Sequence, residues 1–196
     1  FPDHDAVLAL TSAIDGSKKL LPHIWKHFPS AFSGGNEASE AKLKERTASL
    51  RLLPPLQPSS SPTAKRISGR TFTIESNEDE VASVRFDFTG DHCVFTMRDA
   101  LGEHKIKNGL KDWAEGTTSM TGHKLHHEYQ LDDMRVVAGG RWLDANTFEM
   151  TWQYVESAFR DRVLCRFDGE RMTLDRSVNV NSAATSRPQL RGTFAT

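Results

Sequence analysis

The chain has 196 residues, 37% of them hydrophobic, and a formal net charge of -1 at pH 7. This length suits one domain, or one domain with part of another, and gives enough apolar material for a core. Because the charges balance, no overall field attracts nucleic acid or an anionic membrane surface, and we expect no nucleic-acid partner. No apolar run approaches the ~20 residues that cross a bilayer, so we expect no membrane span.

Residues 1–35 are predicted to hold a short strand followed by a helix. The apolar run A-V-L-A-L-T-S-A-I at 6–14 is typical of a buried strand. The next segment predicts a helix that starts near Pro22, with an apolar side formed by Leu20, Leu21, Ile24 and Phe28. This unit has nothing of its own to bury that side against. We therefore expect residues 6–28 to dock on the β-domain predicted below for 66–196, or on a second copy of the chain.

Residues 36–65 differ in composition from what precedes them. A charged helix is predicted from about Glu37 to Leu52, and P-P-L-Q-P-S-S-S-P follows it. Such a run favours extended, polyproline-type backbone and indicates a linker between domains. We therefore predict a first part at 1–35, a helix and linker at 36–65, and a second domain at 66–196.

After Arg66 the apolar pattern changes to period two, which is typical of strands with one dry face. Between Ile67 and Ala195 we expect eight to ten strands, and Asp168-Gly169 suits a two-residue hairpin turn. So many antiparallel strands hide their edges by closing into a barrel or stacking. The predicted fold class is mainly β, an antiparallel barrel preceded by a short strand and two helices. Two strands show the pattern best, with dry faces formed by Val84, Phe86 and Phe88, and by Phe148, Met150, Trp152 and Tyr154.

Large aromatic side chains give the candidate ligand site of the predicted barrel. They line a ligand pocket in some small closed barrels, and in others they simply fill the interior. Both interpretations stay open, and the empty volume beside these residues separates them. The candidate ligand-binding residues are Phe148, Trp152, Tyr154 and Trp142.

The four residues S-E-A-K place Ser39 three positions before Lys42, the spacing of nucleophile and lysine in serine β-lactamases. In those enzymes the lysine is desolvated, which lowers its pKa and lets it take a proton. Here the surrounding N-E-A-S-E-A-K-L-K-E-R predicts a solvated helix. We therefore interpret Ser39 as a surface residue and expect no catalytic residue in this chain.

Three further groups have simple interpretations. H-K-L-H-H-E, with His123, His126 and His127, predicts a solvated polar edge, with a metal site as the alternative. The charges at 160–162 near Glu156 predict a surface ion-pair cluster. The two cysteines of the chain, Cys93 and Cys165, are expected to be buried free thiols rather than a disulfide. No metal or cofactor is expected.

Two stretches resemble bacterial serine hydrolases related to class C β-lactamases and penicillin-binding proteins. The last strand and C-terminal helix of their catalytic domain are similar to F-P-D-H-D-A-V-L-A-L-T-S followed by L-L-P-H-I-W-K-H-F-P. The domain that many of them carry after the catalytic one resembles I-S-G-R-T-F-T-I-E, S-V-R-F-D-F and G-G-R-W-L-D-A-N-T-F-E-M-T-W-Q-Y-V-E.

The resemblance implies that 1–35 is the end of a β-lactamase-like catalytic domain and that 66–196 is an appended, sometimes lipocalin-like, β-domain. No position matches the family's nucleophile, lysine, tyrosine or K-T-G element. We therefore expect a non-catalytic accessory domain that shapes substrate access or joins subunits. Its partners would be the catalytic domain, encoded before Phe1, and a second copy of the chain. The alternative is an independent lipocalin-like barrel that binds a small apolar ligand.

Overall fold

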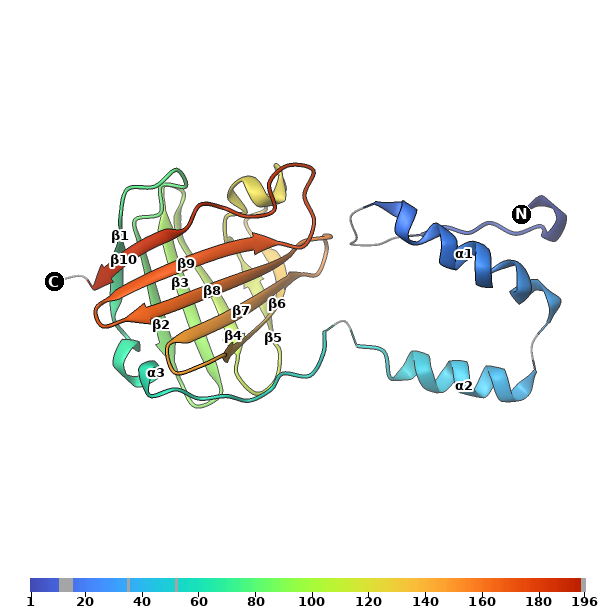
Figure 1. The fold of residues 1–196 in the computed structure, drawn as a ribbon, viewed down its shortest axis with the longest axis horizontal. Coiled ribbons are helices and arrows are strands. Elements are labelled where there is room, and N and C mark those ends of the chain that lie inside the picture. The colour runs from blue at the N-terminus through green and yellow to red at the C-terminus, as the bar shows by residue number, and fades with distance from the viewer. Residues whose placement is uncertain (11–15, 35, 52, 195–196) are drawn as a thin grey trace. The chain divides into compact units, whose positions relative to one another are not determined.

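The computed structural model describes residues 1–10, 16–34, 36–51 and 53–194, and the chain divides into two units after Pro54. Figure 1 shows the chain as a ribbon coloured by residue number, from blue at the N-terminus to red at the C-terminus. Unit 1 is Phe1–Pro54 and is helical, whereas unit 2 is Pro55–Thr196 and contains all the strands of the described residues. Among the described residues, no helix is long and apolar enough to cross a membrane.

Unit 1 consists of short helices joined by loops. Where the sequence predicts the beginning of a strand, residues 6–10 have no regular secondary structure, and 11–14 lie outside the described residues. An apolar run forms a strand only where its backbone groups can hydrogen-bond to a neighbouring strand. Residues 6–10 belong to no strand and pair with no strand of the described residues. The helices of unit 1 are η1 (Pro2–His4), η2 (Ser17–Lys19), α1 (Leu21–His27), η3 (Pro29–Ser33) and α2 (Glu37–Ala48).

The two predicted helices are present in unit 1. The helix near Pro22 is α1, and the charged helix is α2, which ends at Ala48 rather than near Leu52. Asn36 begins α2 as its N-cap, because its side chain accepts a hydrogen bond from the backbone N–H of Ser39 at 2.9 Å. Neither α1 nor α2 contains a buried residue, and Trp25 is 63% exposed. Burial within unit 1 therefore contributes little to holding these helices in place.

Unit 2 is a barrel of antiparallel strands in the order β4-β3-β2-β1-β10-β9-β8-β7-β6-β5. Nine of them close on themselves through one parallel bridge between Gly109 of β4 and Gly139 of β6, and β5 pairs beside β6 as an extra strand. This confirms the predicted fold class. The strands are β1 (Thr71–Ile74), β2 (Ser83–Phe88), β3 (His92–Asp99), β4 (Gly102–Gly109), β5 (Ala114–Thr118), β6 (Met134–Trp142), β7 (Thr147–Tyr154), β8 (Arg160–Asp168), β9 (Arg171–Val178) and β10 (Leu190–Phe194).

Two short helices lie at the two ends of the barrel, as Figure 1 shows: α3 (Pro62–Ile67) at one end and η4 (His123–His126) at the other. The segment 55–65 therefore belongs with the barrel, although its composition predicts a linker. Ser61 begins α3 because its hydroxyl accepts from the backbone N–H of Thr63 at 3.0 Å, and Pro62 occupies the first helical turn.

The barrel interior is packed with the inward-facing side chains of alternate strand positions. On β7, Phe148, Met150, Trp152 and Tyr154 are all buried, as the period-two pattern predicted. Cys93 and Cys165 are buried free thiols, which confirms that prediction, and burial raises the pKa of both well above that of an exposed thiol. The predicted turn is also present, with one difference: Gly169 and Glu170 are its two connecting residues, and Asp168 pairs with Arg171.

Candidate ligand-binding site

Hydrogen bonds fix the segment before α3 to the end of β6 and to the loop between β6 and β7. The hydroxyl of Ser59 accepts from the backbone N–H of Trp142 at 2.6 Å, and the hydroxyl of Ser61 donates to the carbonyl of Ala145 at 2.5 Å. Thr63 adds a bond from its hydroxyl to the side-chain oxygen of Asn146 at 3.0 Å. These bonds hold residues 59–63 across one end of the barrel, where they form one wall of a pocket.

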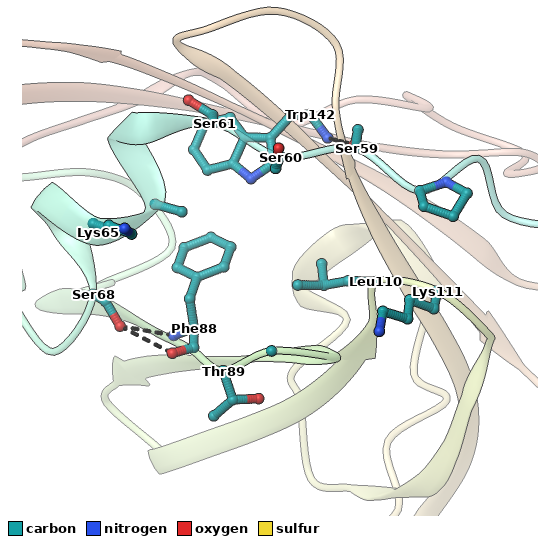
Figure 2. Close-up of a pocket in the computed structure, with 13 residues that line it drawn as sticks. Ser59, Ser60, Ser61, Lys65, Ser68, Phe88, Thr89, Leu110, Lys111 and Trp142 are labelled. Atoms are coloured by element: carbon teal, nitrogen blue, oxygen red, sulfur yellow. Dashed lines mark hydrogen bonds between the residues drawn. The ribbon is translucent and has the colours of Figure 1, made fainter.

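This pocket, which we call the mouth pocket, has a volume of about 750 Å³. Its walls come from the segment before α3, from α3 itself and from the ends of β2, β4 and β6. Figure 2 shows the rings of Phe88 and Trp142 and the side chain of Leu110 directed into it. The ring of Phe88 packs against the ring of Phe148, and their centroids are 5.1 Å apart. The complete lining is Pro58, Ser59, Ser60, Ser61, Ala64, Lys65, Ser68, Phe88, Thr89, Gly90, Leu110, Lys111 and Trp142.

Two ammonium groups belong to the lining of the mouth pocket. Lys65 of α3 and Lys111, which follows β4, lie on opposite sides of the pocket in Figure 2. Both side chains belong to exposed residues, and no carboxylate is among the lining residues. Hydroxyl groups of four serines and a threonine complete the polar part of the wall. The pocket therefore combines an apolar floor with a positively charged rim.

The four predicted ligand-binding residues divide between the mouth pocket and the packed interior of the barrel. Trp142 lines the mouth pocket, and Phe148 lies directly beneath it, with ring centroids 5.0 Å apart. Trp152 lies deeper and donates from its indole N–H to the side-chain oxygen of Asn108 at 2.8 Å. Tyr154 lies beyond it, with its ring 4.7 Å from that of His126. The structure thus brings Trp142 and Phe148 together at the pocket, while Trp152 and Tyr154 belong to the packed interior.

Residues that sequence reasoning did not single out make up most of the mouth pocket. Phe88 was expected on a dry strand face, whereas Ser59 to Lys65 were assigned to a linker and Leu110 and Lys111 were not considered. One local signal was present in the linker: a serine followed by proline and then T-A-K-R-I is the pattern of an N-cap before a short helix. That signal predicts α3, although it does not say what α3 covers.

A buried charged cluster lies deeper in the barrel and consists of Asp161, His126 and Arg176, here called the Asp161 cluster. His126 Nε2 is 2.6 Å from Asp161 Oδ1, and Arg176 donates from Nε to Asp161 Oδ2 at 2.8 Å. Burial by itself would raise the pKa of Asp161, but the charge of Arg176 and the bond with His126 outweigh it, so this pKa lies below its usual value. The carboxylate is therefore ionised at neutral pH.

The Asp161 cluster corrects two predictions. Asp161 was expected in a surface ion-pair cluster and His126 on a solvated edge, yet both side chains are fully buried. Each is stable there because its partner supplies the compensating charge or hydrogen bond. Within the described residues, no group of three or more histidine, cysteine, aspartate or glutamate side chains is arranged to hold a metal ion. Ser39 and Lys42 are both exposed on α2.

No protein-family model and no curated protein matches the sequence. Among solved structures, the chain is similar to one titled "Human cRBP IV", with a TM-score of 0.40 and 14% sequence identity. The match covers 65% of this chain and 96% of that one. A likeness at this level identifies neither a family nor a ligand. The class of the molecule therefore rests on its own geometry, a closed antiparallel barrel with an open pocket at one end.

Proposed function

We propose that the barrel binds a small organic ligand with an apolar body and an acidic group, and that the ligand occupies the mouth pocket. The observation that supports this most directly is the pocket itself, an open space of about 750 Å³ beside a packed interior. Small-molecule sites in proteins are typically about 300 to 1,000 Å³, apolar, and equipped with a few fixed polar groups. The mouth pocket meets each of these conditions.

The apolar body of the ligand is assigned to the floor of the pocket. Phe88, Leu110 and Trp142 present adjoining apolar surface, and Phe88 and Trp142 contact each other with ring centroids 5.7 Å apart. Covering this surface releases water and contributes roughly 25 cal/mol per Å² of buried apolar area. An aromatic or short aliphatic group would gain from that contact, whereas a fully polar ligand would not.

The acidic group is assigned to the rim. Lys65 and Lys111 supply two positive charges without a competing carboxylate in the lining. Since both ammonium groups are exposed to water, each contact with an acidic ligand is worth only about 0.2 to 1 kcal/mol. The rim therefore selects the sign of the ligand's charge, and the floor supplies most of the affinity.

Titration of the 196-residue chain with 5-phenylpentanoate, followed by amide chemical shifts, tests this proposal. We expect saturable shifts at Thr89, Gly90 and Lys111, and binding about twofold to fivefold weaker for the neutral 5-phenylpentan-1-ol. Lys111→Met should remove about half of that difference in binding free energy, because Lys65 remains. Lys107→Met, on β4 but outside the lining, is the matched control and should preserve it. No saturable shift at these three residues with either compound would overturn the proposal.

One observation favours a second function, the accessory domain of a serine hydrolase. Unit 1 leaves apolar side chains exposed on its helices, including Leu21, Trp25 and Leu43, which suits a segment that packs on something else. The assignment of that partner to a β-lactamase-like catalytic domain rests on the sequence resemblance alone. Sequencing the gene upstream of the Phe1 codon decides it: an in-frame S-x-x-K helix supports this function, and its absence there contradicts it.

A further inference from the structure

A second pocket, which we call the far pocket, lies at the end of the barrel opposite α3. It has a volume of about 400 Å³ and is formed by three loops: 78–80 between β1 and β2, 99–101 between β3 and β4, and 121–130 around η4. Strand β3 runs from His92, near the mouth pocket, to Asp99 at the far pocket. The two pockets are therefore separate sites, and the packed interior lies between them.

A buried carboxylate anchors the far pocket. Asp99 accepts hydrogen bonds from the hydroxyl of Thr121 at 2.7 Å and from the backbone N–H of Leu101 at 2.8 Å, and its Oδ1 is 3.0 Å from Nε2 of His104. Burial by itself would raise the pKa of Asp99, but these bonds outweigh it and hold the pKa below its usual value. Asp99 is therefore ionised and accepts hydrogen bonds without donating any.

The hydrogen bonds of Asp99 fix the tautomer of His123. Nε2 of His123 is 2.9 Å from the hydroxyl oxygen of Thr121 and 3.2 Å from Asp99 Oδ2. Because the Thr121 hydroxyl donates its proton to Asp99 and Asp99 Oδ2 only accepts, Nε2 carries the proton. Burial and the charge of Arg176 together lower the pKa of His123 below its usual value, against the opposing effect of Asp79 and Asp99. The imidazole is therefore neutral at neutral pH. Its Nδ1 is left as an acceptor with an unshared electron pair.

A second acceptor faces that nitrogen. Asp79 Oδ2 lies 4.0 Å from Nδ1 of His123, which is too long for a hydrogen bond, and Nδ1 has no proton to donate. Asp79 is held in position by Arg187, whose Nε is 2.9 Å and 3.0 Å from the two carboxylate oxygens. A single nitrogen placed between the two acceptors lies within about 2.9 Å of both. The arrangement is thus suited to a group with several N–H donors.

The charge of the far pocket favours a positively charged donor. Four carboxylates line it, from Glu78, Asp79, Glu80 and Asp99, against the ammonium group of Lys124. Arg187 neutralises Asp79 only in part, because its guanidinium also approaches Glu78 at 3.4 Å. Tyr129 and Leu101 supply the less polar part of the lining, and an aromatic ring near a cation adds further attraction.

From this geometry we propose that the far pocket binds the primary ammonium group of a small ligand between Nδ1 of His123 and the carboxylate of Asp79. The alkyl chain that carries the ammonium group lies against Leu101 and Tyr129. A primary ammonium has three N–H donors, so it bonds to both acceptors and keeps one donor for water or Glu80. This site goes beyond the proposed function, because it uses none of the residues of the mouth pocket.

Titration of the full chain with n-butylammonium chloride tests the site, with amide chemical shifts as the readout. We expect saturable shifts at Leu101, Gly122 and Lys124. The neutral isostere 1-butanol should give none of them, since it lacks the charge and two of the three donors. Equal shifts with both compounds, or no saturable shift with butylammonium, would overturn the proposal and leave the mouth pocket unaffected.

Variants of the carboxylates locate the binding site. Asp79→Asn should weaken butylammonium binding about tenfold or more, because it removes the negative charge that strengthens the hydrogen bond to the ammonium group. Glu75→Gln, an exposed carboxylate outside the lining, is the matched control and should leave the affinity unchanged. If Asp79→Asn does not fold, Glu80→Gln at the exposed edge of the pocket replaces it and should weaken binding by a smaller factor. Unchanged affinity in the folded variant would contradict the assignment.

Discussion

At the scale of single residues, Arg176 is a buried cation with several polar contacts inside the barrel. Its Nε and one terminal nitrogen contact Asp161, and its other terminal nitrogen donates to the carbonyl of Thr121 at 2.6 Å. The side chain is 4% exposed. Removing one partner of such a buried pair leaves an uncompensated charge, which costs far more than the intact pair contributes. Arg176 is therefore a point where one substitution should change stability strongly.

Arg176→Leu should lower the free energy of unfolding by about 3 to 5 kcal/mol, because Asp161 then stays buried without its charged partner. Urea denaturation followed by circular dichroism measures this. Arg162→Leu is the matched control: Arg162 pairs with Glu149 but is 55% exposed, so its loss should cost only about 0 to 1 kcal/mol. Equal losses in the two variants would show that the Asp161 cluster is not held by charge.

The sequence predicted inward-facing apolar residues well and buried polar residues badly. Phe86 and Trp152 were assigned to the interior because alternation along one strand is a local pattern. His126 and Asp161 lie 35 positions apart, and Arg176 is a further 15 away, so no local pattern indicates that they meet. The far pocket likewise brings Asp79, Asp99 and His123 together from three separate loops, which is why it was not predicted.

At the scale of elements, the closure of the barrel depends on glycines. Gly109 and Gly139 form the single bridge between β4 and β6. A Cβ on Gly109 would lie 1.7 Å from the carbonyl oxygen of Asp112, and one on Gly139 would lie 2.8 Å from the ring of Trp113. The chain turns sharply here from β4 toward β5, and only a residue without a side chain leaves room for that backbone.

Gly109→Ala should lower the free energy of unfolding by about 1 to 3 kcal/mol or more, because the atom that its Cβ meets is backbone and cannot rotate away. Thermal or urea unfolding measures the effect. Gly116→Ala on β5 is the matched control, since a Cβ at that position would meet nothing within 4 Å and little change is expected. A Gly109→Ala variant as stable as the parent would show that the bridge adjusts at no cost.

Strands were more predictable than the connections between them. Turn residues such as Asp168-Gly169 indicate a hairpin through their local backbone preferences. Eight to ten strands were predicted, and the described residues form ten. Residues 59–65 were misassigned because their proline and serine content is typical of a linker, while their place in the fold depends on bonds to Trp142 and Ala145, more than eighty positions away. The mouth pocket was missed for the same reason.

At the scale of the whole molecule, the main cluster of buried apolar side chains among the described residues lies in unit 2. Its buried residues run from Ile67 to Leu190, and the strands that carry them are complete within Pro55–Thr196. The helices α1 and α2 of unit 1 contribute no buried residue. Sequence reasoning predicted that residues 6–28 dock on the barrel or on a second copy, and that stays a prediction which a truncation can test.

A chain of residues 55–196 should fold and unfold with a midpoint within about 2 °C of the full chain, since surface changes away from the core usually alter stability by under about 0.5 kcal/mol. Differential scanning calorimetry of both chains measures this. A clearly lower midpoint for 55–196 would instead support docking of unit 1 on the barrel. A midpoint of the full chain that rises with protein concentration would support docking on a second copy.

The net charge of -1 does not show that charged groups are distributed unequally between the two ends of the barrel. Lysines line the mouth pocket and mainly carboxylates line the far pocket, so the charged groups nearest the two pockets differ in sign. A ligand carrying both signs of charge would enter the mouth pocket with its negative group first and the far pocket with its positive group first. Added salt would weaken this electrostatic steering, because the Debye length at 0.15 M is about 8 Å. If both proposed sites bind their ligands, this nearly neutral protein discriminates between small molecules by the sign of their charge.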